Sequence, residues 1–381
     1  MRHLHLIVSI DLRDGGPIAG VYNLSEFRRK HGDETTVVSL DAPGSVKCDN
    51  LPFDWVPLGP SYLGRYRFNT KLVPWLKENA NKFDLVIING IWGYHAFGGW
   101  LGMRGLKVPY CVFTHGMLDP WFKRTYPLKH LKKWLYWPWG GYPVLRDAMA
   151  VCFTCEQERV LAKQSFWLYK AKESVVGYGI NDPPSASPSQ LEAFYEKVPV
   201  ARGKRCILYL SRIHEKKACD LLLKAYAAVM KNNSGWHLVM AGPGNEDYIN
   251  YLKQVADENG ISEAVSWPGM LSGNVKWGAY RAADVFCLPS HQENFAIVVA
   301  EAMACECPVL ISNQVNIWQE IESSKSGFVE PDTLEGIKRL LERWLTVGTS
   351  ERKAMGGRAI ICQKKQFSIE GLSDSLSRFI P

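Results

Sequence analysis

Short apolar runs alternate with longer amphipathic segments along the 381 residues of the chain. In the first half, the apolar runs lie at residues 4–10, 35–40, 84–89, 110–116 and 150–155. Turn residues and a helical pattern follow each run, which is typical of a parallel sheet with helices on its faces. A second series lies at residues 206–212, 236–242, 264–269, 285–290, 308–313 and 327–331. The pattern therefore predicts an α/β protein with two open sheets.

The two series are separated by residues 177–190, GYGINDPPSASPSQ, which are rich in Gly, Pro and Ser. A segment with so little to bury indicates a domain boundary. We place one Rossmann-like domain at residues 1–180 and a second at residues 181–365, with an amphipathic C-terminal helix at residues 366–381 that packs back on the first domain. Because open sheets bind ligands at the carboxyl ends of their strands, we expect these two doubly wound domains to face each other across a cleft.

Composition narrows the class of protein. With 46% apolar and 22% charged residues, the chain is globular rather than disordered. A formal charge of +7 suggests an anionic ligand or surface without requiring nucleic acid. The pairs Cys152/Cys155 and Cys305/Cys307 have no second pair at zinc-site spacing, and the cysteines lie in apolar runs, so we expect reduced thiols and no metal site.

The N-terminal apolar run is interrupted early by Asp11, Arg13 and Asp14, which fits a buried first strand better than a signal peptide. No stretch approaches the ~20 apolar residues that span a bilayer. We therefore expect a cytoplasmic protein whose membrane contact, if it has any, is peripheral.

A loop after the first strand of the second series carries two cations. The strand leads into Ser211 and Arg212, and Lys217 follows at the start of a helix. Two positive side chains at a helix N-terminus, where unpaired N–H groups add about half a positive charge, form a site for a diphosphate. The alternative is that both are solvated surface charges.

Two further loops of the second domain fit the same interpretation. Gly242 and Gly244 flank Pro243 after a strand, where glycine lets the backbone approach a ligand, although G-P-G is also an ordinary turn. A helix that begins near Ala296 would direct its first amides, with those of Asn294 and Phe295, towards the same strand ends.

Glutamates occupy two positions of this last segment. Glu293 projects from the loop, and Glu301 lies one turn beyond Ile297 in the apolar helix AIVVAEAMA. A carboxylate accepts two hydrogen bonds, and a ribose presents two adjacent hydroxyls, so a nucleotide would give Glu301 a reason to be there. The alternative is an exposed glutamate, but its neighbours on that face are apolar.

Together these motifs resemble the retaining glycosyltransferases of family 4, the group 1 glycosyltransferases with the GT-B fold. The resemblance covers nearly the whole chain and rests on S-R-I-x-x-x-K, A-G-P-G, E-N-F-A-x4-E and SGFVEPD in the second domain. In the first domain it rests on Gly15/Gly16 after the first strand and on THG at residues 114–116.

The resemblance implies roles for individual residues. Arg212 and Lys217 would neutralise the diphosphate of a nucleotide sugar, Glu293 would lie at the donor sugar, and Glu301 would contact the ribose. His115 would lie near the transferred sugar. The remaining donor-binding positions would be Gly15, Gly16, Gly242, Gly244, Asn294, Phe295, Ala296 and Ile297. Ser211, Ala218 and Ala296 depart from the family, which often has Gly there.

The activity that the resemblance implies is transfer of a hexose-type sugar, with retention, to a glycan or lipid-linked glycan in surface polysaccharide biosynthesis. Fixed cations and helix amides can stabilise a leaving diphosphate without a metal. Because the chain has no D-x-D carboxylate pair, we expect no metal and no cofactor beyond the donor substrate. A uridine or a guanosine donor fits equally well.

The acceptor side is indicated by aromatic residues. The loop at residues 89–100 supplies Trp92, Tyr94 and His95, which could line an acceptor site. Residues 121–139 mix Lys and Arg with Trp, Phe and Tyr, a composition that suits an anionic membrane surface such as the inner face of the plasma membrane. The alternative is a helix that docks its aromatics into the core of the first domain and leaves its lysines exposed.

Other classes of protein share some of these features. A nucleic-acid-binding protein would carry basic and aromatic residues too, but it would not need Glu293 and Glu301, and the chain has no nucleic-acid-binding motif. A GT-B sugar-nucleotide epimerase, or a binding protein without activity, would share the donor site. Turnover that requires an acceptor would distinguish a transferase from both.

Overall fold

The computed structural model describes residues 1–47, 50–230, 233 and 235–380. The chain forms two compact units: unit 1 consists of Met1–Asn181 and Ser368–Pro381, and unit 2 of Asp182–Phe367. The chain thus leaves unit 1 within the Gly/Pro/Ser-rich segment at residues 177–190. It returns to unit 1 near its C-terminus.

Unit 1 is built on a parallel sheet of seven strands in the order β3-β2-β1-β4-β5-β6-β7. The strands are β1 (Arg2–Ile7), β2 (Glu34–Ser39), β3 (Asp54–Pro57), β4 (Leu85–Asn89), β5 (Tyr110–Phe113), β6 (Ala150–Phe153) and β7 (Glu173–Val175). Side chains on both faces of the central strands are buried, as their continuous apolar runs predict.

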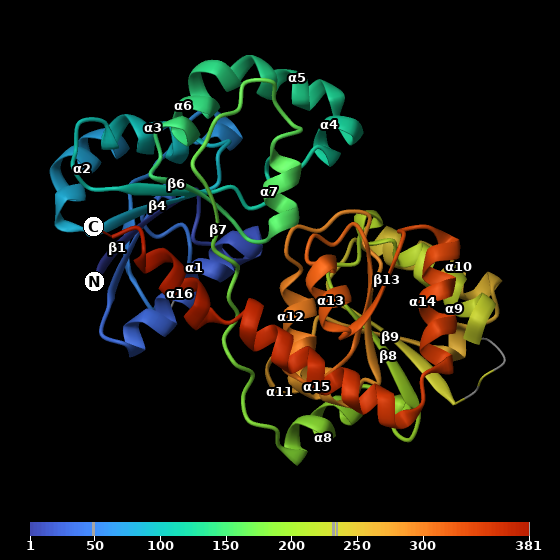
Figure 1. Ribbon diagram of the computed structural model, residues 1–381. Coiled ribbons are helices and arrows are strands. Elements are labelled where there is room, and N and C mark those ends of the chain that lie inside the picture. The colour runs from blue at the N-terminus through green and yellow to red at the C-terminus, as the bar shows by residue number, and fades with distance from the viewer. Residues whose placement is uncertain (48–49, 231–232, 234, 381) are drawn as a thin grey trace. The chain divides into compact units, whose positions relative to one another are not determined.

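Helices cover both faces of this sheet (Figure 1). They are α1 (Gly16–Lys30), α2 (Leu72–Asn79), α3 (Tyr94–Met103), α4 (Trp121–Thr125), α5 (Pro127–Tyr136), α6 (Tyr142–Arg146), α7 (Glu156–Ala162) and α16 (Ile369–Ser377). One core cluster joins α2, α3 and α6 to the sheet, and separate clusters lie under α1 and α16.

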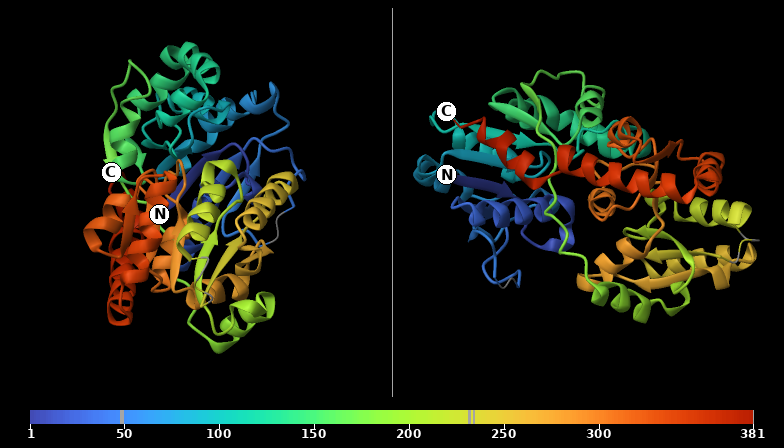
Figure 2. Two further views of the ribbon diagram at one scale, coloured as in Figure 1. Left: turned by 90° about the vertical axis from the view of Figure 1, so that its right-hand side faces the viewer. Right: turned by 60° about the horizontal axis from the view of Figure 1, so that its bottom comes forward.

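The C-terminal helix α16 packs on unit 1 beside α1, and the two helices adjoin in Figures 1 and 2. Leu372 and Leu376 of α16 share a buried cluster with Leu24 of α1 and Leu85 of β4. Ser368 caps α16 by accepting a hydrogen bond from the Gly371 amide. The last helix of the chain thereby covers apolar surface of the first sheet.

Unit 2 has a parallel sheet of six strands in the order β10-β9-β8-β11-β12-β13. The strands are β8 (Arg205–Leu210), β9 (Trp236–Ala241), β10 (Val265–Gly269), β11 (Val285–Leu288), β12 (Val309–Ser312) and β13 (Gly327–Glu330). The helices are α8 (Pro188–Lys197), α9 (Cys219–Met230), α10 (Glu246–Glu258), α11 (Gly273–Ala282), α12 (Ile297–Ala304), α13 (Trp318–Ser324), α14 (Leu334–Thr346) and α15 (Thr349–Gln366). In Figure 1, α9, α10 and α14 cover one face of this sheet, and α11, α12 and α15 lie on the other.

All the apolar runs that predict strands are strands in the structure. The pattern does not predict β3 and β7, because both are short edge strands with half-buried, partly polar sequences, DWVP and ESV. Of the nine cysteines that the structure describes, eight are buried and none forms a disulfide. Within the described residues, no helix combines the length and apolar character required to cross a bilayer.

Candidate active site

Each sheet reverses its strand order beside its first strand. In unit 1 the chain runs from β1 outwards to β3 and then continues from β4 on the other side of β1. In unit 2 the same reversal lies between β8 and β11. Loops that follow these adjacent strands diverge to opposite faces and leave a crevice at the carboxyl ends, where open α/β sheets bind ligands. The predicted site residues lie largely in these loops.

The loop after β8 brings Arg212 and Lys217 to the switch point of unit 2. The phenolic O–H of the buried Tyr209 donates to the Arg212 carbonyl (2.9 Å) and fixes the start of the loop. A short 3-10 turn, Glu215–Lys217, then leads to Ala218, whose φ of 53° turns the backbone into α9. The Arg212 side chain is exposed, whereas only 14% of the Lys217 side chain is exposed.

The loop after β9 contributes Gly242 and Gly244, and packing explains both glycines. A Cβ at Gly242, where φ is 139°, would lie 1.8 Å from the Ser211 carbonyl oxygen. A Cβ at Gly244 would lie 2.8 Å from the Ile213 carbonyl oxygen. The Ile213 amide donates to the Pro243 carbonyl (2.8 Å), so the loops after β8 and β9 are bonded together. These glycines therefore position the loop of Arg212.

The loop after β11 carries Glu293 and is held from two sides. The His291 amide donates to the Lys216 carbonyl (2.9 Å), which ties this loop to the turn before Lys217. The Glu293 amide donates to the Gln314 carbonyl (3.0 Å), and the Asn316 amide donates to the Glu293 carbonyl (3.0 Å). Backbone bonds therefore place Glu293 between the loops that follow β8 and β12.

Helix α12 begins at Ile297, one residue after the predicted start, and Ala296 has a φ of 59°. Asn294 lies in the loop before it, half-buried, and Phe295 is buried against Phe367 (ring centroids 5.2 Å apart). The N-cap residue Ala296 has no polar side chain, so it cannot accept a side-chain hydrogen bond from the first backbone amides of α12. The left-handed conformation at both Ala218 and Ala296 explains why glycine suits these two positions.

Lys217 and Glu293 form an ion pair between the loops after β8 and β11. Burial, together with the charges of Lys216 and Arg212, lowers the pKa of Lys217 to about 7. The carboxylate of Glu293 acts oppositely, because an anion in contact favours the protonated amine. Cations thus outnumber anions around this pair, as a site for a diphosphate requires.

Glu301 lies one turn into α12 and is held by two side chains of α11 that sequence reasoning missed. The ammonium of Lys276 donates to Oε1 (2.8 Å), and the phenol of Tyr280 donates to Oε2 (2.9 Å). Only 15% of the Glu301 side chain is exposed. These partners compensate a carboxylate on an apolar helix, and each oxygen keeps a further lone pair for a ligand hydroxyl.

His115 follows β5 of unit 1 in a left-handed conformation, with a φ of 48°. Its ring stacks on Phe113 at an interplanar angle of 18°, and Nε2 lies 3.2 Å from the Asn89 Oδ1. The Asn89 amide nitrogen lies 3.2 Å from the His5 Nδ1, so Oδ1 faces His115 and accepts from its Nε2–H. Burial, with His95 adding to it, lowers the pKa of His115 to about 4, so the imidazole is neutral near pH 7 with its Nδ1 lone pair available.

Glu158, on α7, holds the loop that carries His115. One carboxylate oxygen accepts from the Thr114 hydroxyl and from the Gly116 amide (both 2.6 Å). The other accepts from the amide and the hydroxyl of Thr154 (both 2.7 Å). Glu158 is 3% exposed, so its charge is balanced by these four bonds. The residues on both sides of His115 are thereby fixed by one buried carboxylate.

Gly15 and Gly16 lie at the start of α1, after the 3-10 turn Leu12–Asp14 that follows β1. Gly15 has a φ of 102°, which an L side chain rarely adopts, and a Cβ at either glycine would meet no atom within 4 Å. Unlike Gly242 and Gly244, these glycines are therefore not explained by packing within the chain. The space beside them can admit a ligand.

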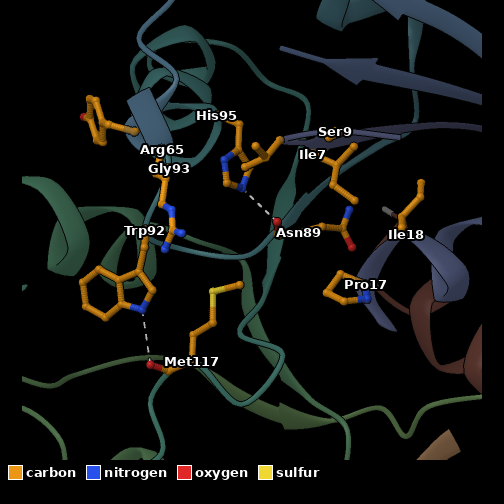
Figure 3. A pocket seen from close by; sticks show the side chains of 12 residues that line it. Ile7, Ser9, Pro17, Ile18, Arg65, Asn89, Trp92, Gly93, His95 and Met117 are labelled. Atoms are coloured by element: carbon orange, nitrogen blue, oxygen red, sulfur yellow. Dashed lines mark hydrogen bonds between the residues drawn. The ribbon is translucent and has the colours of Figure 1, made fainter. Parts of the chain in front are cut away.

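A pocket of about 430 Å³ lies at the switch point of unit 1, and Pro17 and Ile18, which follow these glycines, form part of its lining (Figure 3). Its lining residues are Ile7, Val8, Ser9, Pro17, Ile18, Arg65, Tyr66, Asn89, Trp92, Gly93, His95 and Met117. Of the predicted acceptor residues, Trp92 and His95 line the pocket. Tyr94 does not, because it packs edge-on against Phe68 (4.8 Å between centroids) and Tyr66 in the core.

His95 forms part of the base of this pocket. Its Nε2 lies 2.8 Å from the Asn89 carbonyl oxygen and donates to it. Burial lowers the pKa of His95 to about 4, so its ring is neutral as well. A Cβ at Gly93 would lie 2.7 Å from the His95 Nδ1, which explains the glycine in this turn.

Part of the segment at residues 121–139 docks into the core of unit 1, and another part presents an exposed apolar surface. Trp137 is fully buried and stacks on Phe166 (4.2 Å between centroids), as expected for aromatics docked into the core. Leu128, Leu131 and Leu135 of α5 are instead 78%, 54% and 62% exposed. Positions three and four residues apart share one helix face, so α5 presents an apolar stripe outwards.

The structure therefore brings Arg212, Lys217 and Glu293 together in unit 2, and His115, Asn89 and His95 together in unit 1. Sequence reasoning missed Asn89, Glu158, Lys276, Tyr280 and the pocket residue Arg65. Asn89 had a local signal, since it is the polar last residue of a buried strand. Glu158 had none, because its partners in the His115 loop lie 42 and 44 residues away along the chain.

Comparison with known proteins agrees with this architecture. The model of "Glycosyl transferases group 1" matches residues 192–360, and that of "Glycosyl transferase 4-like domain" matches residues 15–179. The human alpha-1,3/1,6-mannosyltransferase ALG2 is 26% identical over 363 residues, which cover 86% of this chain and 82% of that protein. A D-inositol 3-phosphate glycosyltransferase of Segniliparus rotundus is 28% identical over 182 residues, 46% of this chain but only 39% of that protein.

Among solved structures, the Anabaena protein Alr3699/HepE in complex with UDP and glucose superimposes with a TM-score of 0.75 at 17% identity, covering 99% of this chain and 98% of that one. This similarity concerns the fold. The two family models together span both units and nearly all the residues between positions 15 and 360. The chain belongs to the group 1 glycosyltransferases, the family with the GT-B fold that its motifs resemble.

Proposed function

We propose that this protein is a retaining glycosyltransferase that moves a hexose-type sugar from a nucleotide diphosphate sugar to a glycan or lipid-linked glycan. The observation that carries the proposal is the group of Arg212, Lys217 and Glu293 at the switch point of unit 2. Cations in fixed positions, close to backbone amides, suit a pyrophosphate. The complex of HepE with UDP and glucose supports a nucleotide sugar as the ligand.

The chemistry follows from the charges. When the bond between the anomeric carbon and the phosphate oxygen breaks, negative charge develops on the leaving diphosphate and positive charge on the sugar ring. Arg212 and the protonated Lys217 would stabilise the diphosphate, because groups fixed in a partly buried site lose little energy in reorganising. Glu293, paired with Lys217, would orient the amine and contact the donor sugar. No metal is needed in this scheme.

Donor binding tests the proposal. UDP, UDP-glucose and GDP-mannose would be titrated into the protein and into the Glu301→Ala and Lys217→Ala variants, with thermal unfolding as the readout, since a ligand of the native state raises the unfolding temperature. We expect one nucleotide to stabilise the wild type and each variant to lose most of that shift. An unchanged shift in both variants would contradict the assignment of the site.

Turnover tests the transferase against the epimerase and the inactive binding protein. We expect release of the nucleoside diphosphate to require an acceptor and to continue in the presence of a chelator. Turnover without an acceptor would favour an epimerase or a hydrolase, and loss of activity with the chelator would contradict the metal-independent scheme. The configuration of the product would be read by NMR of the new glycosidic linkage.

We also propose that the exposed face of α5 contacts an anionic membrane on its cytoplasmic side. Leu128, Leu131 and Leu135 form the apolar stripe, and Trp139 continues it at 58% exposure. Lys129 and Lys132 are exposed on the same helix, where each basic residue near an anionic surface contributes about 1 kcal/mol. This arrangement is that of an interfacial helix, and it supports a lipid-linked acceptor in surface polysaccharide synthesis.

A vesicle assay tests this surface. The variant Leu131→Ser/Leu135→Ser should lose binding to vesicles that contain phosphatidylglycerol, because it removes apolar area from the stripe. Replacing Val160 and Ile361, which are also exposed, by Ser is the matched control. Equal binding by both double variants and the wild type would exclude the α5 face.

A further inference from the structure

Arg65 is the one charged side chain among the described residues that line the pocket of unit 1. It lies in the short turn Gly64–Tyr66, between β3 and α2. Figure 3 shows its side chain directed towards Trp92 and the interior of the pocket. The other polar side chains of the lining are neutral: Ser9, Tyr66, Asn89, Trp92 and His95. A ligand in this pocket therefore meets a single full charge, and that charge is positive.

The structure gives Arg65 no ion pair or hydrogen bond to any described residue, although a neighbouring arginine has partners. Arg67 lies 4.0 Å from the Asp41 carboxylate and 3.5 Å from the Ser61 hydroxyl. The Asp41 carboxylate beside Arg67 is also engaged elsewhere, since it accepts from the Ile10 amide (2.9 Å). The charge of Arg65 is thus available to a ligand.

The turn that carries Arg65 has an unusual backbone. Leu63 and Arg67, on either side of it, both have left-handed conformations, with φ values of 61° and 59°. Left-handed backbone is costly for residues with a side chain, and it persists where the surroundings define it. The Tyr62 and Phe68 amides each donate to the other residue's carbonyl (2.8 Å), which closes the base of the turn. Arg65 is therefore presented by a defined loop rather than by a mobile one.

A second cation reinforces the positive field near the pocket. The Lys133 ammonium lies 4.5 Å from the centre of the Trp92 ring, which lines the pocket, and 5.4 Å from that of Phe122. No acidic side chain of the described residues forms an ion pair with it. Trp92 is held in place by its indole N–H, which donates to the Met117 carbonyl (3.3 Å). Trp92 and Tyr66 offer flat apolar surface, as sugar binding requires.

We propose that the acceptor carries an anionic group, a phosphate or a carboxylate, which Arg65 binds while the sugar ring packs against Trp92. The proposal rests on the function proposed above and specifies the class of its acceptor. A guanidinium donates two parallel hydrogen bonds to either group, and such charge-assisted bonds are stronger than neutral ones. Arg65 would select charged acceptors over neutral sugars of the same shape.

Matched ligands that differ only in charge test this selection. Glucose and glucose 6-phosphate form one pair, and galactose and galacturonic acid another. Their affinities for the full-length protein would be measured by calorimetry at 0.15 M salt. We expect at least one charged member to bind at least tenfold more tightly than its neutral counterpart. Its advantage should fall below threefold in Arg65→Gln and recover partly in Arg65→Lys.

Two controls keep this outcome specific. Arg29→Gln removes the same charge from an exposed position near the far end of α1 and should leave the preference unchanged. UDP binding, measured in parallel, should be unaffected in Arg65→Gln. If the wild type binds UDP but shows no charge preference, or binds none of the charged sugars, the inference fails while the proposed function stands. If it binds neither UDP nor a nucleotide sugar, the proposed function fails.

A further experiment asks whether the anionic group belongs to a lipid diphosphate or to a soluble phosphate or carboxylate. A polyprenyl diphosphate sugar in detergent micelles would be compared with the soluble sugar phosphate, in wild type and Arg65→Gln. Binding of the lipid-linked compound at least tenfold more tightly than the sugar phosphate would assign the charge to a lipid diphosphate, and similar affinities for the two would assign it to any accessible phosphate or carboxylate. Equal binding of each compound by wild type and Arg65→Gln would overturn the role of Arg65.

Discussion

The two switch points have the same topology but different chemistry. In unit 2, the loops after β8 and β11 bring charged groups together, so that Arg212, Lys217 and Glu293 form a compact ionic site. In unit 1, the loops after β1, β3, β4 and β5 provide neutral imidazoles, aromatic rings and a pocket with one arginine. Since both sheets reverse their strand order in the same way, the fold fixes where a ligand binds. The loop residues determine which ligand binds there.

The two regions also differ in how their loops are held. Gly242 and Gly244 of unit 2 are packed against the loop after β8, so backbone contact positions Arg212. In unit 1, Gly15 and Gly16 face open space, and the buried carboxylate of Glu158 positions the His115 loop. One site thus depends on close packing of backbone and the other on a buried hydrogen-bond network. Five predictions test this contrast.

The largest effect is expected for Lys217→Ala. Loss of a charged hydrogen bond to the diphosphate should reduce UDP affinity ten- to hundredfold, by about 1.5–3 kcal/mol. Loss of charge stabilisation should reduce turnover by about 10² to 10³. Calorimetry and initial rates would measure both effects. Lys253→Ala, an exposed lysine of α10, is the control, and equal behaviour of the two variants would contradict an ionic site in unit 2.

Glu158→Gln should have the next largest effect, on unit 1. The glutamine amide opposes two of the four donors that the carboxylate accepts, so the free energy of unfolding should fall by about 2–4 kcal/mol. Because the His115 loop loses its support, kcat should fall while UDP affinity stays constant, which loss of folded protein alone would not produce. Glu156→Gln, in the same helical turn but exposed, should change neither quantity. An unchanged kcat in the folded Glu158→Gln variant would show that Glu158 does not position the His115 loop for catalysis.

The affinity for UDP should depend more steeply on pH than it would if no group of the donor site titrated near neutral pH. Burial holds the pKa of Lys217 at about 7, so the free protein loses this proton as the pH rises above 7. A bound diphosphate favours the ammonium, so binding above pH 7 takes up a proton. UDP affinity should therefore fall by up to about tenfold per pH unit between pH 7.5 and 9. In Lys217→Arg the slope should vanish, and an equal slope in that variant would exclude Lys217 as the titrating group.

His115 should not contribute to this titration. Its pKa of about 4 keeps the imidazole neutral above pH 5.5. Galacturonic acid binding measured without donor would show this as an affinity that is constant between pH 5.5 and 7, because the pKa of Lys133, which burial lowers to about 8, lies above that range. A histidine titration near pH 6.5 would contradict the buried, neutral imidazole.

The smallest effect is expected at the left-handed alanine of unit 2. Replacing Ala296, with a φ of 59°, by Gly should stabilise the protein by about 0.5–1 kcal/mol, because relief of the strained backbone exceeds the added entropy of the unfolded chain. Denaturant unfolding would measure the change. Ala354→Gly, at an exposed position inside α15, should instead destabilise by up to about 1 kcal/mol. If both substitutions changed the free energy of unfolding in the same direction, the left-handed backbone at Ala296 would not explain the effect.

Much of the fold followed from local patterns. The continuous apolar runs identified the central strands, since a strand buried on both faces has apolar side chains at every position. The edge strands β3 and β7 were not predicted, because a half-buried strand of three or four residues lacks a distinct hydrophobic pattern. From residues 177–190 we expected the second domain to begin at residue 181. In the structure, the chain passes from unit 1 to unit 2 between Asn181 and Asp182, and back to unit 1 between Phe367 and Ser368.

The donor loops were indicated by motifs because their residues lie close together along the chain. Arg212 and Lys217 are five residues apart, and Glu293 and Glu301 eight apart. Their partners were not indicated. Lys276 and Tyr280 reach Glu301 from a separate helix, and nothing in the sequence around either of them distinguishes it from a surface lysine or a core tyrosine.

The sequence by itself determined the class of fold, the loops that hold the candidate residues and the family, because periodicity and motif spacing are properties of neighbouring residues. Tertiary structure alone decided that Glu158 supports the His115 loop, that Tyr94 belongs to the core and that Arg65 stands unpaired in a pocket. The first two depend on groups 26 to 44 residues apart, and the third on the lack of a partner at close range. Burial and charge balance arise only when distant segments pack together, so no local pattern encodes them.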